Sequence, residues 1–344
     1  NWQSFNIGKD ASVNVVQTNT SSVLLNRIGG DSPSQILGRL SANGQIVLVN
    51  PNGMLFGKDG SVSAAALTAS SLGITDADFM AGNMKFSGHG ATGAIINQGS
   101  LNTSGGYVAL LGTQVSNEGK IQTQGGNAYL GAAQSAQLPV TASGRIKLEL
   151  SPSAVEAAVA NSGTIVTEGG QVFMQASTAA GVMAKVLHTG SIDTTGERGG
   201  SVHVLADGGE IRMSGSIMAN STSKNVYGRT LAGGDIVIGR DEDASVLAAS
   251  TDVSGLTLES KGGFVETSGH QLTIDNTRVV AKDWLLDPDN IQITNDATLA
   301  TGYTSRVSAT ALGQALSAGV NVTLNTTTGL SAPSDTTGLT QDGF

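Results

Sequence analysis

The chain contains no cysteine among its 344 residues, so disulfide bonds are excluded. It also lacks any apolar run approaching the ~20 residues that a membrane-spanning helix needs. Basic residues form no cluster and the net charge is −9, which excludes electrostatic binding to nucleic acid or anionic lipid as the main activity. Aromatic residues make up only 4%, and the abundant Val, Ile, Leu and Ala suit a narrow core of stacked strands.

No charged-then-apolar leader opens the chain, and its first five residues already have the pattern of a strand inside a domain. We therefore expect the natural start to lie upstream of Asn1. The last twenty residues are rich in Thr, Gly and Ser, and we expect the protein to continue beyond Phe344.

Glycine is abundant, with 47 copies, and many of them belong to a repeated phrase. The template Asn-x-Gly-x-(Leu/Ile)-x-Thr-x-Gly-Gly, followed by an alternating apolar strand, occurs in residues 97–111, 117–130 and 161–174. Looser copies begin at His188 and near Gly262. A repeat of about 20 residues is typical of one coil of a solenoid. The sequence therefore predicts an elongated all-β solenoid of roughly 16 coils rather than two or three globular domains.

Residues 44–50 form an apolar strand that runs directly into Pro51, Asn52 and Gly53. Proline fixes φ at the first position of a turn, and Asn-Gly tolerates positive φ after it. We expect Asn52 to adopt this positive φ in a corner that joins two strands of one coil.

Two regions break the repeat and are expected to leave the coil, at 64–86 and 138–158. In the first, 64–72 fits a helix or an apolar strand, and 76–80 predicts a helical turn capped by Thr75. In the second, 145–150 alternates as a strand, and 152–156 could open one helical turn. Helical spacing over 309–318, with Gly319 as the C-cap, predicts a later helix.

Three motifs in order resemble the secretion domain of filamentous-haemagglutinin-type exoproteins, which use two-partner secretion. The motifs are Asn26-Arg27-Ile28, Asn50-Pro51-Asn52-Gly53 and the Trp-Leu-Leu-Asp-Pro-Asp-Asn run of 284–290. Together with 262–270, the last motif resembles the high-molecular-weight adhesin branch. The family's Asn-Pro-Asn-Leu motif and N-terminal cap are absent from these residues.

The resemblance implies a right-handed parallel β-helix exported through the periplasm and an outer-membrane β-barrel partner, to be secreted or held at the bacterial surface. It implies an N-terminally incomplete secretion part over 1–160, stalk repeats over 161–290, and the start of a further adhesin segment with a partly disordered end over 291–344. The residues expected to matter for export are Asn26, Arg27, Ile28, Asn50, Pro51, Asn52 and Gly53.

The remaining polar residues favour structural roles over catalysis. Asn97, Asn117 and Asn161 share one template position and are expected to stack as a hydrogen-bonded ladder. Acidic residues gather at 241–243 and 287–289, but acidic runs in turns are more typical of solvated corners than of active sites or calcium sites. The four histidines are too dispersed for a metal motif, and we expect no cofactor. Five sequons could carry sugars, as the adhesin branch can: Asn19, Asn102, Asn220, Asn321 and Asn325.

The sequence thus favours a surface adhesin that is not an enzyme and that binds a host cell receptor or host protein. One alternative is a haem-carrier (hemopexin)-binding exoprotein, in which the regions 64–90 or 138–158 would be binding loops. A β-helix polysaccharide-degrading enzyme is the third and weakest interpretation.

Overall fold

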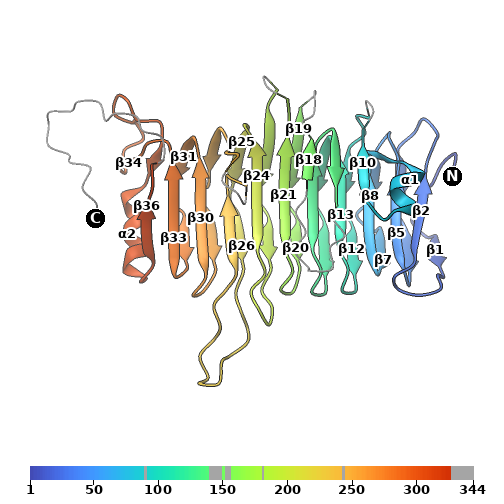
Figure 1. Cartoon of the computed structure of the whole chain (residues 1–344), viewed down its shortest axis with the longest axis horizontal. Coiled ribbons are helices and arrows are strands. Elements are labelled where there is room, and N and C mark those ends of the chain that lie inside the picture. The colour runs from blue at the N-terminus through green and yellow to red at the C-terminus, as the bar shows by residue number, and fades with distance from the viewer. Residues whose placement is uncertain (89–90, 139–148, 152–155, 180–181, 242–244, 327–344) are drawn as a thin grey trace.

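The computed structural model describes residues 1–88, 91–138, 149–151, 156–179, 182–241 and 245–326. In these residues the chain winds through three long parallel sheets and forms a right-handed β-helix (Figure 1). Except in the last coil, the strands of the β-helix pass through sheet 1, sheet 2 and sheet 3 in turn, so each of these sheets collects one strand from every coil. The predicted all-β solenoid is therefore confirmed.

Sheet 1 has ten strands, in spatial order β1 (Ser12–Val15), β4 (Arg39–Ala42), β7 (Ser61–Ala64), β12 (Ser100–Thr103), β15 (Lys120–Thr123), β20 (Thr164–Val166), β23 (Ser191–Asp193), β26 (Gly215–Met218), β29 (Leu256–Glu259) and β32 (Arg278–Val280). Sheet 2 has eleven, in the order β2 (Val23–Arg27), β5 (Gln45–Val49), β8 (Ala66–Ser70), β13 (Val108–Gly112), β16 (Ala128–Ala132), β21 (Val172–Ser177), β24 (Val202–Asp207), β27 (Asp235–Ile238), β30 (Phe264–Gly269), β33 (Asp283–Pro288) and β36 (Asn321–Leu324). Sheet 3 also has eleven: β3 (Ser34–Ile36), β6 (Met54–Phe56), β11 (Ile95–Asn97), β14 (Gln114–Asn117), β19 (Ala157–Asn161), β22 (Ala184–His188), β25 (Glu210–Met213), β28 (Ser250–Asp252), β31 (Gln271–Ile274), β35 (Arg306–Val307) and β34 (Gln292–Ile293).

Each of the three sheets of the coil thus holds ten or eleven strands in the described residues, and the expectation of roughly 16 coils is wrong. Dividing the chain length by one repeat ignored the residues that leave the coil. At a strand spacing of about 4.8 Å, eleven coils give a rod about 50 Å long.

Every second strand residue points into the coil, where one continuous apolar core runs along the rod. Leu101, Ile121 and Ile165 are fully buried partners in neighbouring strands of sheet 1. Like residues stack on like because the parallel register places the same template position of each coil side by side. The pattern explains why branched aliphatic residues dominate the composition.

The double glycines stand where sheet 1 passes into sheet 2, at a corner where successive backbones nearly touch. A Cβ added to Gly170 would overlap the carbonyl oxygen of Gly126, and one added to Gly200 would overlap that of Gly170. Only glycine allows this approach, so the repeated Gly-Gly of the template is a packing requirement of the stacked coils.

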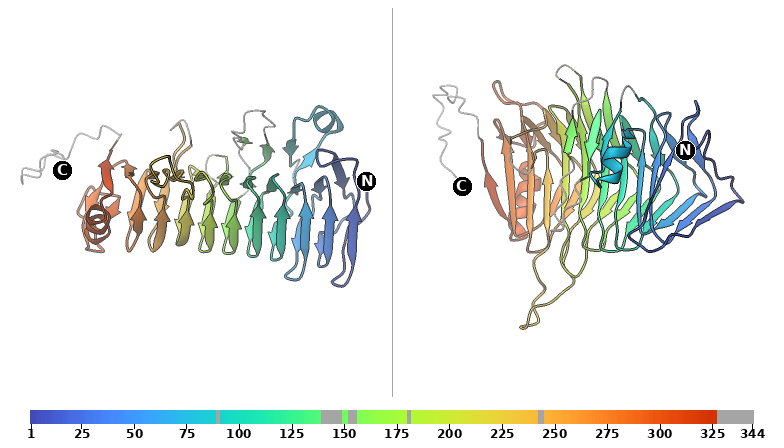
Figure 2. Two further views of the ribbon diagram at one scale, coloured as in Figure 1. Left: turned by 90° about the horizontal axis from the view of Figure 1, so that it is seen from below. Right: turned by 45° about the vertical axis from the view of Figure 1, so that its right-hand side comes forward.

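A small antiparallel sheet lies outside the coil, beside α1 (Asp76–Met80) (Figure 2). Its strands, in order, are β18 (Glu149–Ser151), β17 (Ser135–Gln137), β10 (Lys85–Ser87) and β9 (Gly73–Ile74). The Thr75 side chain caps α1 by accepting a hydrogen bond from the Asp78 amide, as predicted. Both segments that were expected to leave the coil contribute to this sheet.

The first segment that leaves the coil, called the excursion below, begins after β8. The expected bounds, 64–86, were too wide, since β7 and β8 are ordinary strands of the coil. All five residues of β8 are buried, which explains why the sequence showed no strand alternation there. Of the strand expected over 145–150, only 149–150 belong to β18, and 145–148 lie outside the described residues, as do 152–155 of the expected helical turn.

The antiparallel sheet covers a second apolar core on the outer face of sheet 2. This core contains Phe86 from β10 packed over Val47, Ala109 and Tyr129 of sheet 2. Burial raises the pKa of the Tyr129 phenol, so this side chain stays neutral. The first coils are therefore packed on both faces of one sheet.

The rod ends with α2 (Ala309–Ser317), which Ser308 caps and after which Gly319 adopts φ +83°. The helix expected over 309–318 is present, and Ala311 and Ala315 bury one face of α2 against the last coils. No helix among the described residues has the length and apolar content to cross a membrane.

Candidate functional site: the first corners of the rod

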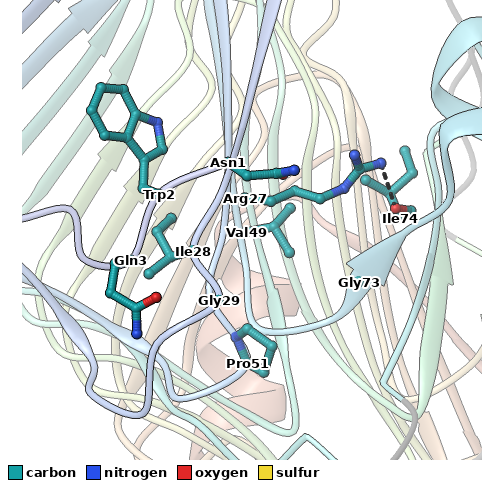
Figure 3. Close-up of a pocket in the computed structure, with 10 residues that line it drawn as sticks. All are labelled: Asn1, Trp2, Gln3, Arg27, Ile28, Gly29, Val49, Pro51, Gly73 and Ile74. Atoms are coloured by element: carbon teal, nitrogen blue, oxygen red, sulfur yellow. Dashed lines mark hydrogen bonds between the residues drawn. The ribbon is translucent and has the colours of Figure 1, made fainter.

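A pocket of about 550 Å³ opens beside the first coils, between the start of the chain and the strand β9 that begins the excursion (Figure 3). The motif residues Arg27, Ile28 and Pro51 line it together with Gly73 and Ile74. Pro51 follows Ile28 by 23 positions and Arg27 by 24, so two separate motifs meet at one place with the excursion.

Arg27 ends β2 and points outward, and its guanidinium reaches the excursion rather than a turn of its own coil. Nη2 donates to the carbonyl oxygen of Ile74 at 2.8 Å (Figure 3), and Nη1 lies 2.5 Å from Oδ1 of Asp76. Asp76 begins α1, where a carboxylate also interacts favourably with the helix N-terminus. Arg27 therefore ties the second strand of the rod to residues 47 and 49 positions later.

Asn26 points the opposite way, into the coil, and is 5% exposed. Its Oδ1 accepts a hydrogen bond from Trp2 Nε1 at 3.0 Å, and its Nδ2 lies 3.5 Å from the Val47 carbonyl oxygen. Ile28, also buried, pairs with Trp2 through a parallel bridge. Asn26 and Ile28 thus hold the first residues of the chain against the first coil.

Asn50 is fully buried and organises the corner that follows β5. Its Nδ2 donates to the Ser32 carbonyl oxygen and to Ser34 Oγ, both at 3.0 Å, and its Oδ1 accepts from the Asn52 amide at 3.0 Å. Asn52 Nδ2 in turn donates to the Gly30 carbonyl oxygen at 2.6 Å. The two amides therefore fasten this corner to the corner of the preceding coil.

The positive φ that was expected at Asn52 falls instead on Gly53, at +96°. The Gly53 amide donates to the Asn50 carbonyl oxygen at 2.9 Å, closing the turn, and Pro51 supplies its fixed φ. A Cβ on Gly53 would overlap the Ala94 carbonyl oxygen, because the chain returning from the excursion stacks directly on this corner. Close approach and backbone conformation both require glycine at this position.

Asn97, Asn117 and Asn161 lie one above the other inside sheet 3. Asn97 Nδ2 donates to Asn117 Oδ1, and Asn117 Nδ2 donates to Asn161 Oδ1, each at 2.7 Å. The next coil places His188 at the same level, and its Nδ1 lies 3.1 Å from Asn161 Nδ2. Sequence reasoning did not include His188 in this stack, although the fourth copy of the template carries it at the asparagine position.

The five sequon asparagines differ in whether their side-chain nitrogen is already bonded. The nitrogens of Asn102, Asn220 and Asn321 donate to Ser100 Oγ, Glu259 Oε1 and Asp283 Oδ1, respectively, at 2.9–3.0 Å. Asn19 is exposed and its Oδ1 accepts hydrogen bonds from Ser21 and Ser22. Asn325 is exposed near the end of the described chain.

Both acidic runs approach Arg240, whose pKa is raised first by Glu266 and then by Asp241 and Asp287. Asp241 accepts hydrogen bonds from the Ser245 and Val246 amides, and Glu242 and Asp243 lie outside the described residues. Asp289 lies 3.1 Å from His270 Nδ1 in a later coil. Within the described ranges no group of three or more His, Asp or Glu side chains is placed to hold a metal ion.

Trp284, 1% exposed, fills the inner core as a large aromatic residue.

Comparisons with known proteins bear on the fold and the family of the chain. The crystal structure of the HMW1 secretion domain from Haemophilus influenzae superposes with a TM-score of 0.66 at 23% identity, covering 89% of this chain and 91% of that one, which shows the shared fold. A heme/hemopexin-binding protein of Haemophilus influenzae strain Rd is 31% identical over 169 residues, and another from the same species is 41% identical over 68 residues.

These two alignments cover 46% and 20% of this chain but only 18% and 7% of the relatives, so the chain corresponds to a small part of their length. The model of the TPS secretion domain matches residues 1–209, well over half of the chain. Proteins with this domain are exported across the outer membrane and are secreted or stay at the cell surface. The chain therefore belongs to the TPS secretion domain family.

Proposed function

We propose that this β-helix directs the export of an adhesin- or haemagglutinin-like exoprotein, and that Asn26, Arg27, Ile28 and Asn50–Gly53 carry the export signal. Family membership implies an outer-membrane transporter as partner. The observation that carries the residue assignment is the convergence of both motifs and the excursion on one pocket.

The contacts of these residues suit a folding template. Arg27 and Asn50 bond to later and earlier turns, so the first coils and the excursion become ordered together. Each further coil then buries apolar area worth about 25 cal/mol per Å² on a surface that already exists. Folding outside the cell can thus draw the chain outward without a nucleotide.

Within this proposal, residues 1–160 serve secretion, 161–290 form the stalk, and 291–344 begin the next segment, whose last residues, 327–344, are outside the described part. Binding to a host cell receptor or host protein would belong to the complete exoprotein. If sugars are attached, Asn19 and Asn325 are the favoured acceptors, because the amide nitrogens of the other three sequons already donate hydrogen bonds.

The names of the curated relatives favour a second candidate function, binding of a haem carrier such as hemopexin. The segment that leaves the coil between β8 and β11 and the one around β17 and β18 would then offer binding loops. Immobilised protein tested against purified hemopexin and against host cells separates the two functions. Retention of hemopexin at micromolar concentration supports the carrier role, and binding to cells alone supports adhesion.

We do not propose an enzyme, because the acidic residues that could serve a β-helix hydrolase or lyase are engaged elsewhere. Asp241 holds its own loop and Asp289 contacts His270. Asp241 and Asp287 both lie close to Arg240, whose pKa is raised first by its hydrogen bonds to Glu266 and then by these two carboxylates.

The export assignment is tested by expressing the full-length exoprotein with its cognate barrel and measuring protein in the medium and in the periplasm. Arg27→Ala is expected to accumulate in the periplasm, because the excursion loses its attachment to β2. Arg212→Ala, which removes an exposed arginine 3.6 Å from Glu210 in a later coil, is the matched control. Normal secretion of Arg27→Ala would reduce this corner to ordinary scaffold.

A further inference from the structure

A groove of about 850 Å³ crosses the outer face of sheet 2 and shares no lining residue with the pocket beside the first coils. It begins beside β16, where Asn127 lines it, and ends beside β30, where Phe264 lines it. One wall is the glycine corner, which includes Gly169, Gly199 and Gly234. The volume lies within the range of small-molecule and oligomer binding sites.

The floor of the groove is a column of polar side chains from four successive coils. Asn127, Gln171, Ser201 and Asp235 each stand at the start of a strand of sheet 2, next to residues that pair in register. The side-chain Nε2 of Gln171 donates to Ser201 Oγ at 3.1 Å, and the backbone N–H of Gln171 donates to Asn127 Oδ1 at 2.8 Å. The column therefore presents one polar group per coil, about 4.8 Å apart.

Aromatic rings border this column. The His203 ring stacks on Phe173 with centroids 5.0 Å apart, and its Nε2 lies 3.2 Å from Ser201 Oγ. Phe264 directly follows Asp235 in the column and is half-buried. A ligand in the groove would thus meet planar apolar faces beside hydrogen-bonding groups.

The glycine wall is explained by packing, but the polar floor is not. On the same outer face, the preceding coils carry Val47 and Ala109, which the antiparallel sheet covers. Beyond Phe173 that cover ends, and the outer face becomes polar and open as the groove. One buried atom of the floor, Gln171 Oε1, has no hydrogen-bond partner within the described protein.

The charges of the groove are balanced. Arg240 is held in a bidentate ion pair by the buried Glu266, which leaves Arg198 and Asp235 as the exposed charges of opposite sign on the lining. A strongly anionic ligand would need several available cations. The chemistry therefore fits an uncharged ligand rich in hydroxyl groups.

We propose that this groove binds a linear, neutral oligosaccharide that lies along the rod with about one sugar ring per coil. Carboxylate and hydroxyl groups such as those of Asp235 and Ser201 can pair with neighbouring hydroxyls, and the rings of His203 and Phe264 can pack against sugar faces. The groove binds rather than cleaves, because Asp235 is the single carboxylate that lines it and hydrolysis takes two. This site is independent of the export signal.

The test is an NMR titration of the intact chain with cellotetraose, maltotetraose and chitotetraose as neutral probes, and tetragalacturonate as the anionic probe. At least one neutral tetrasaccharide is expected to shift the amides of Gln171, Ser201 and His203. Asp235→Ala and Ser201→Ala should weaken that binding about tenfold or more. Tyr227→Ala is the control, because it removes an aromatic residue that is 85% exposed on a protruding loop outside the groove.

Two results would overturn the proposal. One is the absence of groove shifts with all three neutral probes at millimolar concentration while the unliganded spectra of the chain and both variants show a folded rod. The other is preferential binding of tetragalacturonate, which would assign the groove to an anionic ligand. Because Asp235 is exposed, its replacement leaves the fold intact and keeps the measurement interpretable.

Discussion

The Nδ1 atom of His188 lies 3.1 Å from the side-chain nitrogen of Asn161, at the end of a buried ladder of amides. Because the Asn161 nitrogen can only donate, Nδ1 accepts and the proton of the neutral ring sits on Nε2, 3.4 Å from the Ser216 carbonyl oxygen. The ladder thus fixes one tautomer of a histidine that is 1% exposed.

Acid is expected to destabilise the rod through this histidine. Burial lowers the pKa of His188 to about 4, from an ordinary value of 6.5. The unfolded chain therefore binds a proton between pH 6.5 and 4 that the folded chain does not. Stability is fully present above pH 6.5 and falls by up to about 3 kcal/mol as the pH drops to 4.

The His188→Asn variant extends the ladder with a group that does not titrate, so its stability should change less with pH. Thermal unfolding of both proteins at pH 7, 5.5 and 4 measures the difference. Equal losses of stability in the two proteins would show that His188 does not carry the effect.

The middle of the amide ladder should be its most sensitive position. Asn117→Ala removes a fully buried side chain and leaves Asn97 and Asn161 each without one hydrogen bond. We expect a loss of about 2–4 kcal/mol, since buried polar groups without partners are costly. Chemical denaturation measures it, with Asn102→Ala as control, because half-exposed Asn102 makes only a local bond to Ser100. A loss in Asn117→Ala no larger than in the control would contradict the structural role.

In the corner formed by Asn50–Gly53, Gly53→Ala should reduce secretion and the stability of the rod more than Asn52→Ile. The alanine would have to adopt φ +96° and overlap the Ala94 carbonyl oxygen, whereas Asn52 has an ordinary φ and its replacement loses only the side-chain bonds to the Gly30 carbonyl oxygen and to Asn50 Oδ1. The positive φ alone costs about 1–2 kcal/mol in alanine. Secretion by the cognate barrel and the unfolding midpoint of the purified rod are the two measurements, and the reverse order of effects would be inconsistent with the corner geometry.

The antiparallel sheet should detach without unfolding the coil. Phe86→Ala removes a fully buried ring from the second core, at a cost of about 3–5 kcal/mol. Hydrogen exchange is expected to become faster in β9, β10 and β17 while the inner strands of sheet 2 stay protected. Met80→Ala, on the exposed side of α1, is the control. Uniformly faster exchange along the whole chain would mean that both cores unfold together.

The repeat was sufficient to predict the coils because each copy must bury the same face against its neighbours, and the asparagine level could be read directly from the template. The fate of β8 could not be predicted, because its outer face is covered by residues from β10 and β17 that are far away in sequence. The same limit applies to Arg27, whose partner Asp76 follows 49 residues later without any repeating spacing. The polar groove also depends on where the outer cover ends.

Because of the second core, the coils of the described rod differ in their resistance to a pulling force. From β2 to β21 the antiparallel sheet packs on the outer face of sheet 2, whereas the described strands from β24 onward have no such cover. A force applied along the axis would therefore separate the strands of the uncovered coils before those of the covered coils. Separation would slow where it reaches the coils that the antiparallel sheet covers.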